Sequence, residues 1–178
     1  MGTGVTVDSV AGLSDAERAE VAELSRAVYP PGSITGWPGL AVEWDAPGWC
    51  VRVREGDSLA SYAGLYIRAG ELNGQPVLVG GVGNVKTHPD SRGQGLASAA
   101  LREAAAFLGD RGADFGLLVC EPGLTRFYAR LGWRPLRGRL MVRQRGEAAE
   151  FTLCPAMTLA LASAGLEGGT VDLCGPPW

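Results

Sequence analysis

The sequence predicts a single α/β domain over residues 1–178. Its sheet is expected to be mixed and mostly antiparallel, with six to seven strands, a central parallel pair and helices on both faces. Two patterns support this fold class. Strand-like runs joined by short turns fill the first half, as in an antiparallel meander. A strand, a glycine-containing loop, a helix and a second strand follow, and such a unit makes its two strands near-parallel neighbours. The chain has 178 residues, 46% hydrophobic and 20% charged, which suffices for one core without disulfide staples.

The N-terminal elements follow from local patterns. Val5 to Val10 alternates like an edge strand. Ser14-Asp15-Ala16-Glu17 is a capping box that opens a helix running to about Tyr29, where Pro30-Pro31 ends it. The segment from Ile34 to Gly48 is rich in proline, glycine and tryptophan, and it is predicted as a short helix or a structured loop over a pocket.

Turn residues mark the meander that comes next. Trp49 to Glu55 and Leu59 to Ala69 are predicted as two strands joined at Gly56-Asp57. Asn73-Gly74 is typical of a tight hairpin turn and leads into a third strand, Gln75 to Thr87.

The second half begins with a helix and a buried strand. Apolar residues at helical spacing predict a helix over Leu96 to Leu108, closed by Gly109 or Gly112. Phe115 to Cys120 is a short apolar run of the buried-strand kind. The remaining elements are a short helix, Thr125 to Leu131, stopped by Gly132, and a final strand pair, Trp133 to Val142 with Phe151 to Leu161.

The loop between the third strand and the helix carries the strongest chemical signal. Gly93 and Gly95 lie in Arg92-Gly93-Gln94-Gly95-Leu96-Ala97-Ser98 and let the backbone approach a ligand closely. The first unpaired N–H groups of the helix then point at an anion, aided by the helix dipole. A diphosphate is the expected ligand of such a loop, although two glycines also occur in strand-to-helix loops for turn geometry alone.

Composition limits the other function classes. A net charge of −3 and a pI near 5.2 argue against a nucleic-acid partner. The four cysteines form no C-x-x-C pair, so neither a metal site nor a disulfide framework is indicated. No leader pattern and no long apolar run occurs, which predicts a cytoplasmic protein without a membrane partner. The arginines at 134, 137, 139, 143 and 145 are interpreted as the solvated face of a strand pair.

The loop, followed by Arg126-Phe127-Tyr128-Ala129-Arg130-Leu131-Gly132-Trp133, resembles the GNAT acyltransferase superfamily, and the element order fits that fold from Val5 onward. The resemblance implies acetyl-CoA as co-substrate, its pyrophosphate bound by backbone amides of the R-x-x-G-x-A motif and its pantetheine by the preceding strand end. The implied cofactor-binding residues are Val85, Lys86, Thr87, Arg92, Gly93, Gln94, Gly95, Leu96, Ala97 and Ser98.

The chain is also similar to the aminoglycoside 2′-N-acetyltransferase branch. The shared features are Tyr128, Gly132-Trp133, Trp44-Asp45, Asp172 and Trp178. This implies a small polycationic acceptor, with Glu43, Trp44, Asp45 and Trp178 as candidate binding residues. Trp37 and Trp49 are expected to join them in an acidic, aromatic floor. Gly83-Asn84 departs from that branch, which has a carboxylate at this place, and Pro176-Pro177 replaces a more acidic tail.

Acetyl transfer to an amine requires a neutral amine, a stabilised oxyanion and a proton for the leaving thiolate. A lysine-like amine is neutral in only about one molecule in 2,500 at pH 7, so deprotonation is the larger problem. The resemblance implies Tyr128 as general acid, and a backbone N–H near Val85 is expected to stabilise the oxyanion.

No residue is an obvious base. Asn84 can orient a water, and Glu121 is a candidate at a strand end. Glu43, Asp45 or the Trp178 carboxylate could also accept the proton through water, or the acceptor could have a low pKa.

Two further residues and several alternatives complete the expectations. His88, before Pro89, is expected to be a turn residue, and direct transfer is favoured over an acyl-enzyme at Cys120 because no histidine stands near it in sequence. A protein N-terminus, a lysine side chain or another small amine stays open as the acceptor. A non-catalytic acyl-CoA-binding module stays open as a different class. The apolar run from Met157 to Leu161 permits a homodimer without requiring one.

Overall fold

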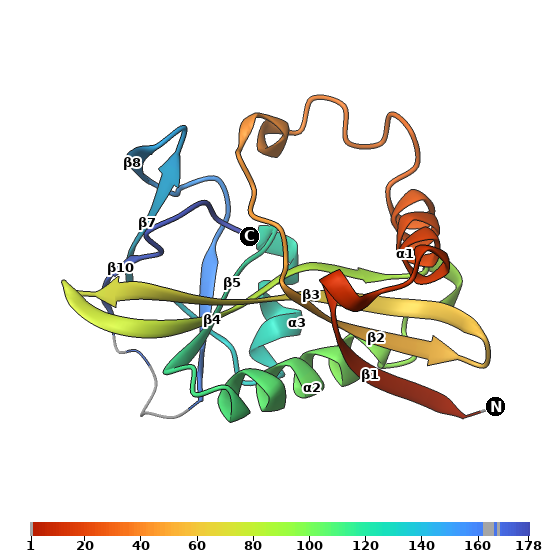
Figure 1. Ribbon diagram of the computed structural model, residues 1–178. Coiled ribbons are helices and arrows are strands. Elements are labelled where there is room, and N and C mark those ends of the chain that lie inside the picture. Colours follow the sequence, from red (N-terminus) through yellow and green to blue (C-terminus); the bar gives the residue numbers. More distant parts are fainter. Residues whose placement is uncertain (1, 162–165, 167) are drawn as a thin grey trace.

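The computed structural model describes residues 2–161, 166 and 168–178, and its core is one mixed sheet between helices. Within those residues the sheet has ten strands, in the order β6-β9-β5-β4-β3-β10-β7-β8, with β2 also pairing β3 and β1 completing that edge. Helix α1 covers one face and α2 the other (Figure 1). None of the helices in these ranges has the length and hydropathy that a membrane crossing requires.

The strands are β1 (Thr3–Ser9), β2 (Trp49–Glu55), β3 (Ser58–Leu72), β4 (Gln75–Thr87), β5 (Phe115–Val119), β6 (Arg134–Pro135), β7 (Gly138–Gln144), β8 (Glu147–Glu150), β9 (Ala156–Ala160) and β10 (Gly169–Asp172). The helices are α1 (Asp15–Val28), α2 (Leu96–Asp110) and α3 (Thr125–Ala129), and the 3₁₀ turns are η1 (Val10–Gly12), η2 (Pro38–Ala41), η3 (Pro89–Ser91) and η4 (Pro122–Leu124).

The predicted capping box starts α1. The Glu17 N–H donates to Ser14 Oγ at 3.3 Å, and the Ser14 N–H donates to Glu17 Oε2 at 2.8 Å. The Ser14 N–H and the Ser14 hydroxyl, which both donate to the Glu17 carboxylate, lower the pKa of Glu17 to about 2 with help from Arg52. The Arg52 guanidinium pairs with Asp8 at 3.0 Å and with Glu17 at 2.8 Å. One arginine of β2 therefore ties β1 and α1 to the sheet.

The meander is confirmed, because β2, β3 and β4 pair antiparallel in sequence order. Asn73 and Gly74 have φ of 52° and 78°, the two positive values that a type I′ hairpin turn needs. Strand β3 runs past the predicted Ala69 because Glu71 and Leu72 pair with β10. The segment from 34 to 48 is a loop that contains the short η2, in line with the prediction.

The predicted final strand pair is confirmed only over a short stretch, where β6 pairs antiparallel with β9. Trp133 to Val142 divides into β6 and β7, and only Arg134 and Pro135 pair with β9. The Leu136 N–H still donates to the Ala156 carbonyl at 2.9 Å, but the pairing stops there because the stretch before Pro155 is not a strand. Strand β7 instead pairs with β8 and lies parallel to β10. These short strands also enlarge the sheet beyond the predicted six to seven.

The last residue is docked rather than frayed. Trp178 is 4% exposed, its ring stacks on Tyr66 at 5.2 Å, and its indole N–H donates to the Leu117 carbonyl at 3.1 Å. A Cβ at Gly81 would lie 2.3 Å from the indole, and one at Gly83 would lie 3.0 Å from the Trp178 carbonyl carbon. Glycine at both positions therefore makes room for the tail.

A pair of glycine substitutions tests this packing. We expect Gly81→Ala to lower the free energy of unfolding by about 1–3 kcal/mol, because the added methyl group displaces the Trp178 ring. The control is Gly109→Ala in α2, where a Cβ meets no atom within 4 Å; alanine there is expected to be neutral or to stabilise by up to about 1 kcal/mol. Urea denaturation measures both, and equal midpoints for the two variants would contradict the proposed packing of Trp178.

Candidate functional site

The site is built where β4 and β5 separate. Their parallel ladder contains Val79 to Gly81 and Phe115 to Leu117, and it goes no further. Beyond that point the Leu117 carbonyl accepts from the Trp178 indole. Two parallel strands thus part at the centre of the sheet, a feature that local sequence patterns do not encode.

A β-bulge in β4 lies just after this separation. Gly83 pairs with Gly64 and Lys86 with Tyr62, so Asn84 and Val85 together face a single residue of β3. Asn84 is exposed and has φ of 55°, the left-handed region that asparagine tolerates better than most residues. Because a bulge leaves a residue outside the ladder, it frees a backbone N–H beside the parting strands.

A groove of about 330 Å³ opens at the N-terminus of α2. Gly93 and Gly95 have φ of 78° and 82°, and Gly95 is the residue that precedes the helix. The first helical acceptor is the Gly95 carbonyl, which the Ala99 N–H reaches at 3.0 Å. The three amides before Ala99 therefore have no helical acceptor and are available to an anion. The groove is lined by Thr87, Ser91, Arg92, Gly93, Gly95, Leu96, Ala97, Ser98, Phe127, Arg130 and Leu131.

Most of the cofactor-binding residues proposed from sequence lie in this lining, but Gln94, Val85 and Lys86 do not. Four groove residues had been given no role: Ser91, Phe127, Arg130 and Leu131. Phe127, Arg130 and Leu131 belong to the motif around Tyr128. Phe127 lies on the short helix α3 and Arg130 caps its C-terminus, a placement that could have suggested that they face the loop.

Tyr128 is 5% exposed and is not among the residues that line the groove, although its neighbour Phe127 is. Its ring packs edge-on against Phe127 and Trp133, with centroids 5.1 and 6.4 Å away. Burial raises the pKa of Tyr128, and the neighbouring Cys120 and Tyr29 raise it further. The phenol therefore stays protonated at neutral pH and can donate a proton but not accept one.

Lys86 is the only lysine in the chain, and it is 5% exposed. Its Nζ donates to Ser25 Oγ of α1 at 2.7 Å and lies 5.1 Å from the Tyr62 ring centre, and the described residues give it no carboxylate partner. Burial lowers the pKa of this amine to about 8. The side chain thus packs under α1 and does not face the groove.

The end of β5 gathers other titratable groups. Glu121 is exposed there and near enough to Tyr29 at the end of α1 to raise the pKa of that phenol, though burial is the larger cause. Burial raises the pKa of Cys120 to about 11, which keeps the thiol protonated and unsuited to carry an acyl group.

His88 lies in the turn after β4, as predicted. Its Nδ1 accepts a hydrogen bond from the Asp90 N–H at 3.3 Å.

Two of the candidate acceptor-binding residues, Asp45 and Trp178, lie close together. The Asp45 N–H donates to the carbonyl of Pro177, the residue before Trp178, at 2.7 Å. Trp44 stacks on Trp37, with ring centres 5.9 Å apart. Glu43 is directed elsewhere, because its carboxylate accepts from the Arg145 N–H at 3.0 Å at the β7–β8 turn.

The expected acidic, aromatic floor needs two corrections. Trp49 lines a small pocket with Asp45 and Arg68, but its ring stacks elsewhere, against Phe107 of α2 and against Arg111 just after that helix. Asp45 forms an ion pair with Arg68, so its charge is already balanced. In the described part of the chain, no group of three or more histidine, cysteine or acidic residues is placed to hold a metal ion.

Comparison with known proteins gives a consistent result. Residues 10–136 match the family model described as an acetyltransferase (GNAT) domain. No curated protein sequence matches the chain. A GNAT family acetyltransferase from Brucella melitensis, solved in complex with acetyl-CoA, superposes with a TM-score of 0.58 at 16% identity over 94% of each chain.

Two further solved structures share the fold. YhbS from Escherichia coli, a GNAT family N-acetyltransferase in complex with CoA, has a TM-score of 0.63 at 16% identity over 96% of this chain and 89% of its own. A GCN5-related N-acetyltransferase from Kribbella flavida has a TM-score of 0.56 at 20% identity over 76% of this chain. The chain covers 34% of that protein, about a third of its length.

The buried amine predicts a pH-dependent stability. The pKa of Lys86 is about 8 when folded and 10.5 in its ordinary state, so between these values the unfolded chain binds a proton that the folded chain does not. We expect the free energy of unfolding to rise with pH across this window for the wild type, relative to Lys86→Met. Urea denaturation from pH 7.5 to 10.5 tests this; parallel profiles would show that Lys86 titrates normally in the folded protein.

Proposed function

Since this chain belongs to the GNAT acetyltransferase family, we propose that it transfers the acetyl group of acetyl-CoA directly to a primary amine of a small molecule. The main support for this proposal is that three structural features lie next to one another in the sheet. The β4–β5 ladder stops at Gly81, the bulge at Asn84 follows it, and β4 then leads into the anion-binding groove before α2.

The groove fits the diphosphate of a coenzyme A molecule. It combines free helix amides with open backbone at Gly93 and Gly95, where no atom lies within 4 Å of a Cβ position. Arg92 and Arg130 line it and supply positive charge. Acetyl-CoA bound there would supply an acetyl thioester, an acyl group activated for transfer to an amine.

The roles of the protein groups follow from their protonation states. Tyr128, which stays protonated, donates the proton that the departing thiolate requires. A backbone N–H at the bulge of Asn84 and Val85 stabilises negative charge on the acyl oxygen. Among the candidate bases, Asp45 is paired with Arg68, whereas Glu121 is exposed and forms no ion pair within the described residues. We therefore assign proton removal, through water held by Asn84, to Glu121.

As the acceptor we propose an aminoglycoside-like polyamine, with Glu43, Trp44, Asp45 and Trp178 as its binding residues. Two features support it: the stacked rings of Trp37 and Trp44 can bind a cation, and the Asp45 carboxylate is 38% exposed. In this arrangement an ammonium group of the acceptor shares Asp45 with Arg68. A cytoplasmic location and a monomer or homodimer are both compatible with such an enzyme.

Replacement of the proposed acid tests the chemistry. We expect Tyr128→Phe to reduce turnover roughly 10- to 10⁴-fold with coenzyme A affinity unchanged, because only proton donation is lost. The measurement is release of coenzyme A thiol from acetyl-CoA over a panel of aminoglycosides, polyamines, amino acids and short peptides. The matched control is Tyr62→Phe, a buried tyrosine next to Lys86, which should change turnover less than about twofold.

The same panel separates the alternatives. Turnover confined to peptides would replace the polyamine by a protein acceptor. Silence across the panel, with coenzyme A still binding, would point to an acceptor outside the panel or to a non-catalytic binding module. Full activity of Tyr128→Phe would remove the phenol from the mechanism.

Charge at the groove is tested separately. We expect Arg130→Gln to raise the dissociation constant of coenzyme A about tenfold, or ~1.4 kcal/mol, because a cation facing the diphosphate is removed. Arg134→Gln is the control, since Arg134 is exposed on β6 and does not line the groove. Isothermal titration calorimetry measures both, and equal affinities would place the diphosphate elsewhere.

A further inference from the structure

Arg68 joins three segments that are distant in the sequence. Its guanidinium forms an ion pair with Asp45, donates to the Pro176 carbonyl at 2.6 Å, and lies 5.1 Å from the centre of the Trp178 ring. The side chain is 19% exposed. Strand β3, the loop before β2 and the tail thus meet at one cation.

The partners of Arg68 are also bonded to one another. Asp45 donates its N–H to the Pro177 carbonyl at 2.7 Å, and its carbonyl lies 3.4 Å from the Tyr66 hydroxyl, which donates to it. A Cβ at Gly175 would lie 2.7 Å from Arg68 Nη1, so a larger residue there would push the guanidinium out of this position. We call Arg68, Asp45 and the tail residues 175–178 the latch.

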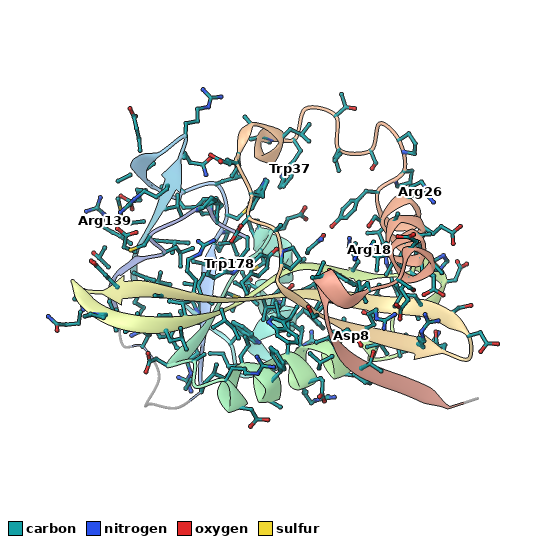
Figure 2. The ribbon with its side chains drawn as sticks, in the orientation of Figure 1. Asp8, Arg18, Arg26, Trp37, Arg139 and Trp178 are labelled. Atoms are coloured by element: carbon teal, nitrogen blue, oxygen red, sulfur yellow. The ribbon has the colours of Figure 1, made fainter. Side chains whose placement is uncertain are left out.

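The latch lies beside the point where transfer is proposed. Trp178 packs against Gly81 and Gly83, directly before the bulge at Asn84. Figure 2 shows Trp178 at the middle of the sheet face, below the arched segment that carries Trp37. None of the latch residues lines the groove before α2. The latch therefore borders the acceptor side and is separate from the coenzyme A side.

We infer that Arg68 is a positioning residue that holds the Asp45 loop and the tail together as one wall of the acceptor site, and so sets the affinity for the acceptor without changing that for acetyl-CoA. This inference rests on the proposed function. It adds that the acceptor wall is assembled from two chain segments, neither of which belongs to the regular sheet.

The chemistry explains why the residue is arginine. The bond to the Pro176 carbonyl comes from Nη1, and the ion pair with Asp45 from Nη2. A planar guanidinium presents both donors at a fixed spacing and also stacks on an aromatic ring. A lysine ammonium can pair with Asp45 but cannot hold all three partners in this geometry.

Kinetics on the best acceptor of the panel test the inference. We expect Arg68→Met to raise the acceptor KM roughly 10- to 100-fold, the usual effect of a displaced binding wall, with the acetyl-CoA KM within about twofold of wild type. Arg68→Lys should be intermediate. Arg139→Met is the control and should match wild type. Arg139 of β7 pairs with Glu150 of β8, at the edge of the sheet away from the latch (Figure 2).

A second readout needs no acceptor. Hydrogen exchange of the Asp45 amide and the Trp178 indole is expected to become at least about tenfold faster in Arg68→Met, while the amides of β4 and β5 keep their protection. Asp45→Asn keeps the size of the side chain and removes its charge. It should reproduce the kinetic effect even if Arg68→Met folds poorly.

The outcomes are distinguishable. Equal rises in both KM values, an unchanged acceptor KM in Arg68→Met and Asp45→Asn, or unchanged exchange of the Asp45 amide would each overturn the positioning role. A wild type that turns over no member of the panel contradicts the proposed function instead, and the exchange rates then still decide whether Arg68 holds the two segments together.

Discussion

The separation of β4 from β5 is the constraint on which the rest of the structure depends. Two parallel strands that part inside a sheet leave backbone groups without partners, and buried groups of this kind must be satisfied. Here the Trp178 indole bonds the Leu117 carbonyl and fills the space beside Gly81. The tail thus stabilises a gap that would otherwise destabilise the sheet. In the proposed reaction, this gap is the place where acetyl-CoA from one side and the acceptor from the other would meet.

Charge is handled in two ways inside this molecule. Arg52 and Arg68 are each partly or wholly withdrawn from water, and each is paired with a carboxylate, so they hold segments together. Lys86 is as deeply buried as Arg52, but it has only a serine hydroxyl and an aromatic face beside it, so burial lowers its pKa. An arginine could not lose its proton in that position, and the single lysine can.

Much of the architecture follows from short-range patterns. The capping box of α1, the Asn73-Gly74 hairpin and the loop before α2 each depend on residues a few positions apart, and all three occur as predicted. Short-range patterns did not predict the strands in the last third of the chain. Strands β6 to β10 are short and are stabilised by pairing with strands that are distant in the sequence. A two-residue strand such as β6 has no periodicity from which it could be recognised.

The candidate site also has one part that follows from local sequence and another that depends on tertiary contacts. The sequence by itself determined the glycine loop and the free amides at the N-terminus of α2, because these need only their neighbours in the chain. Phe127, Arg130 and Leu131 complete the groove from a distant part of the chain. Tertiary structure decided the rest. The bulge at Asn84 reverses the alternation of β4 and turns Lys86 under α1, while Trp49 and Trp44 separate to different parts of the fold. The pairing of Asp45 with Arg68 and the docking of Trp178 join residues more than 20 positions apart, and only the packed chain brings such groups within bonding distance.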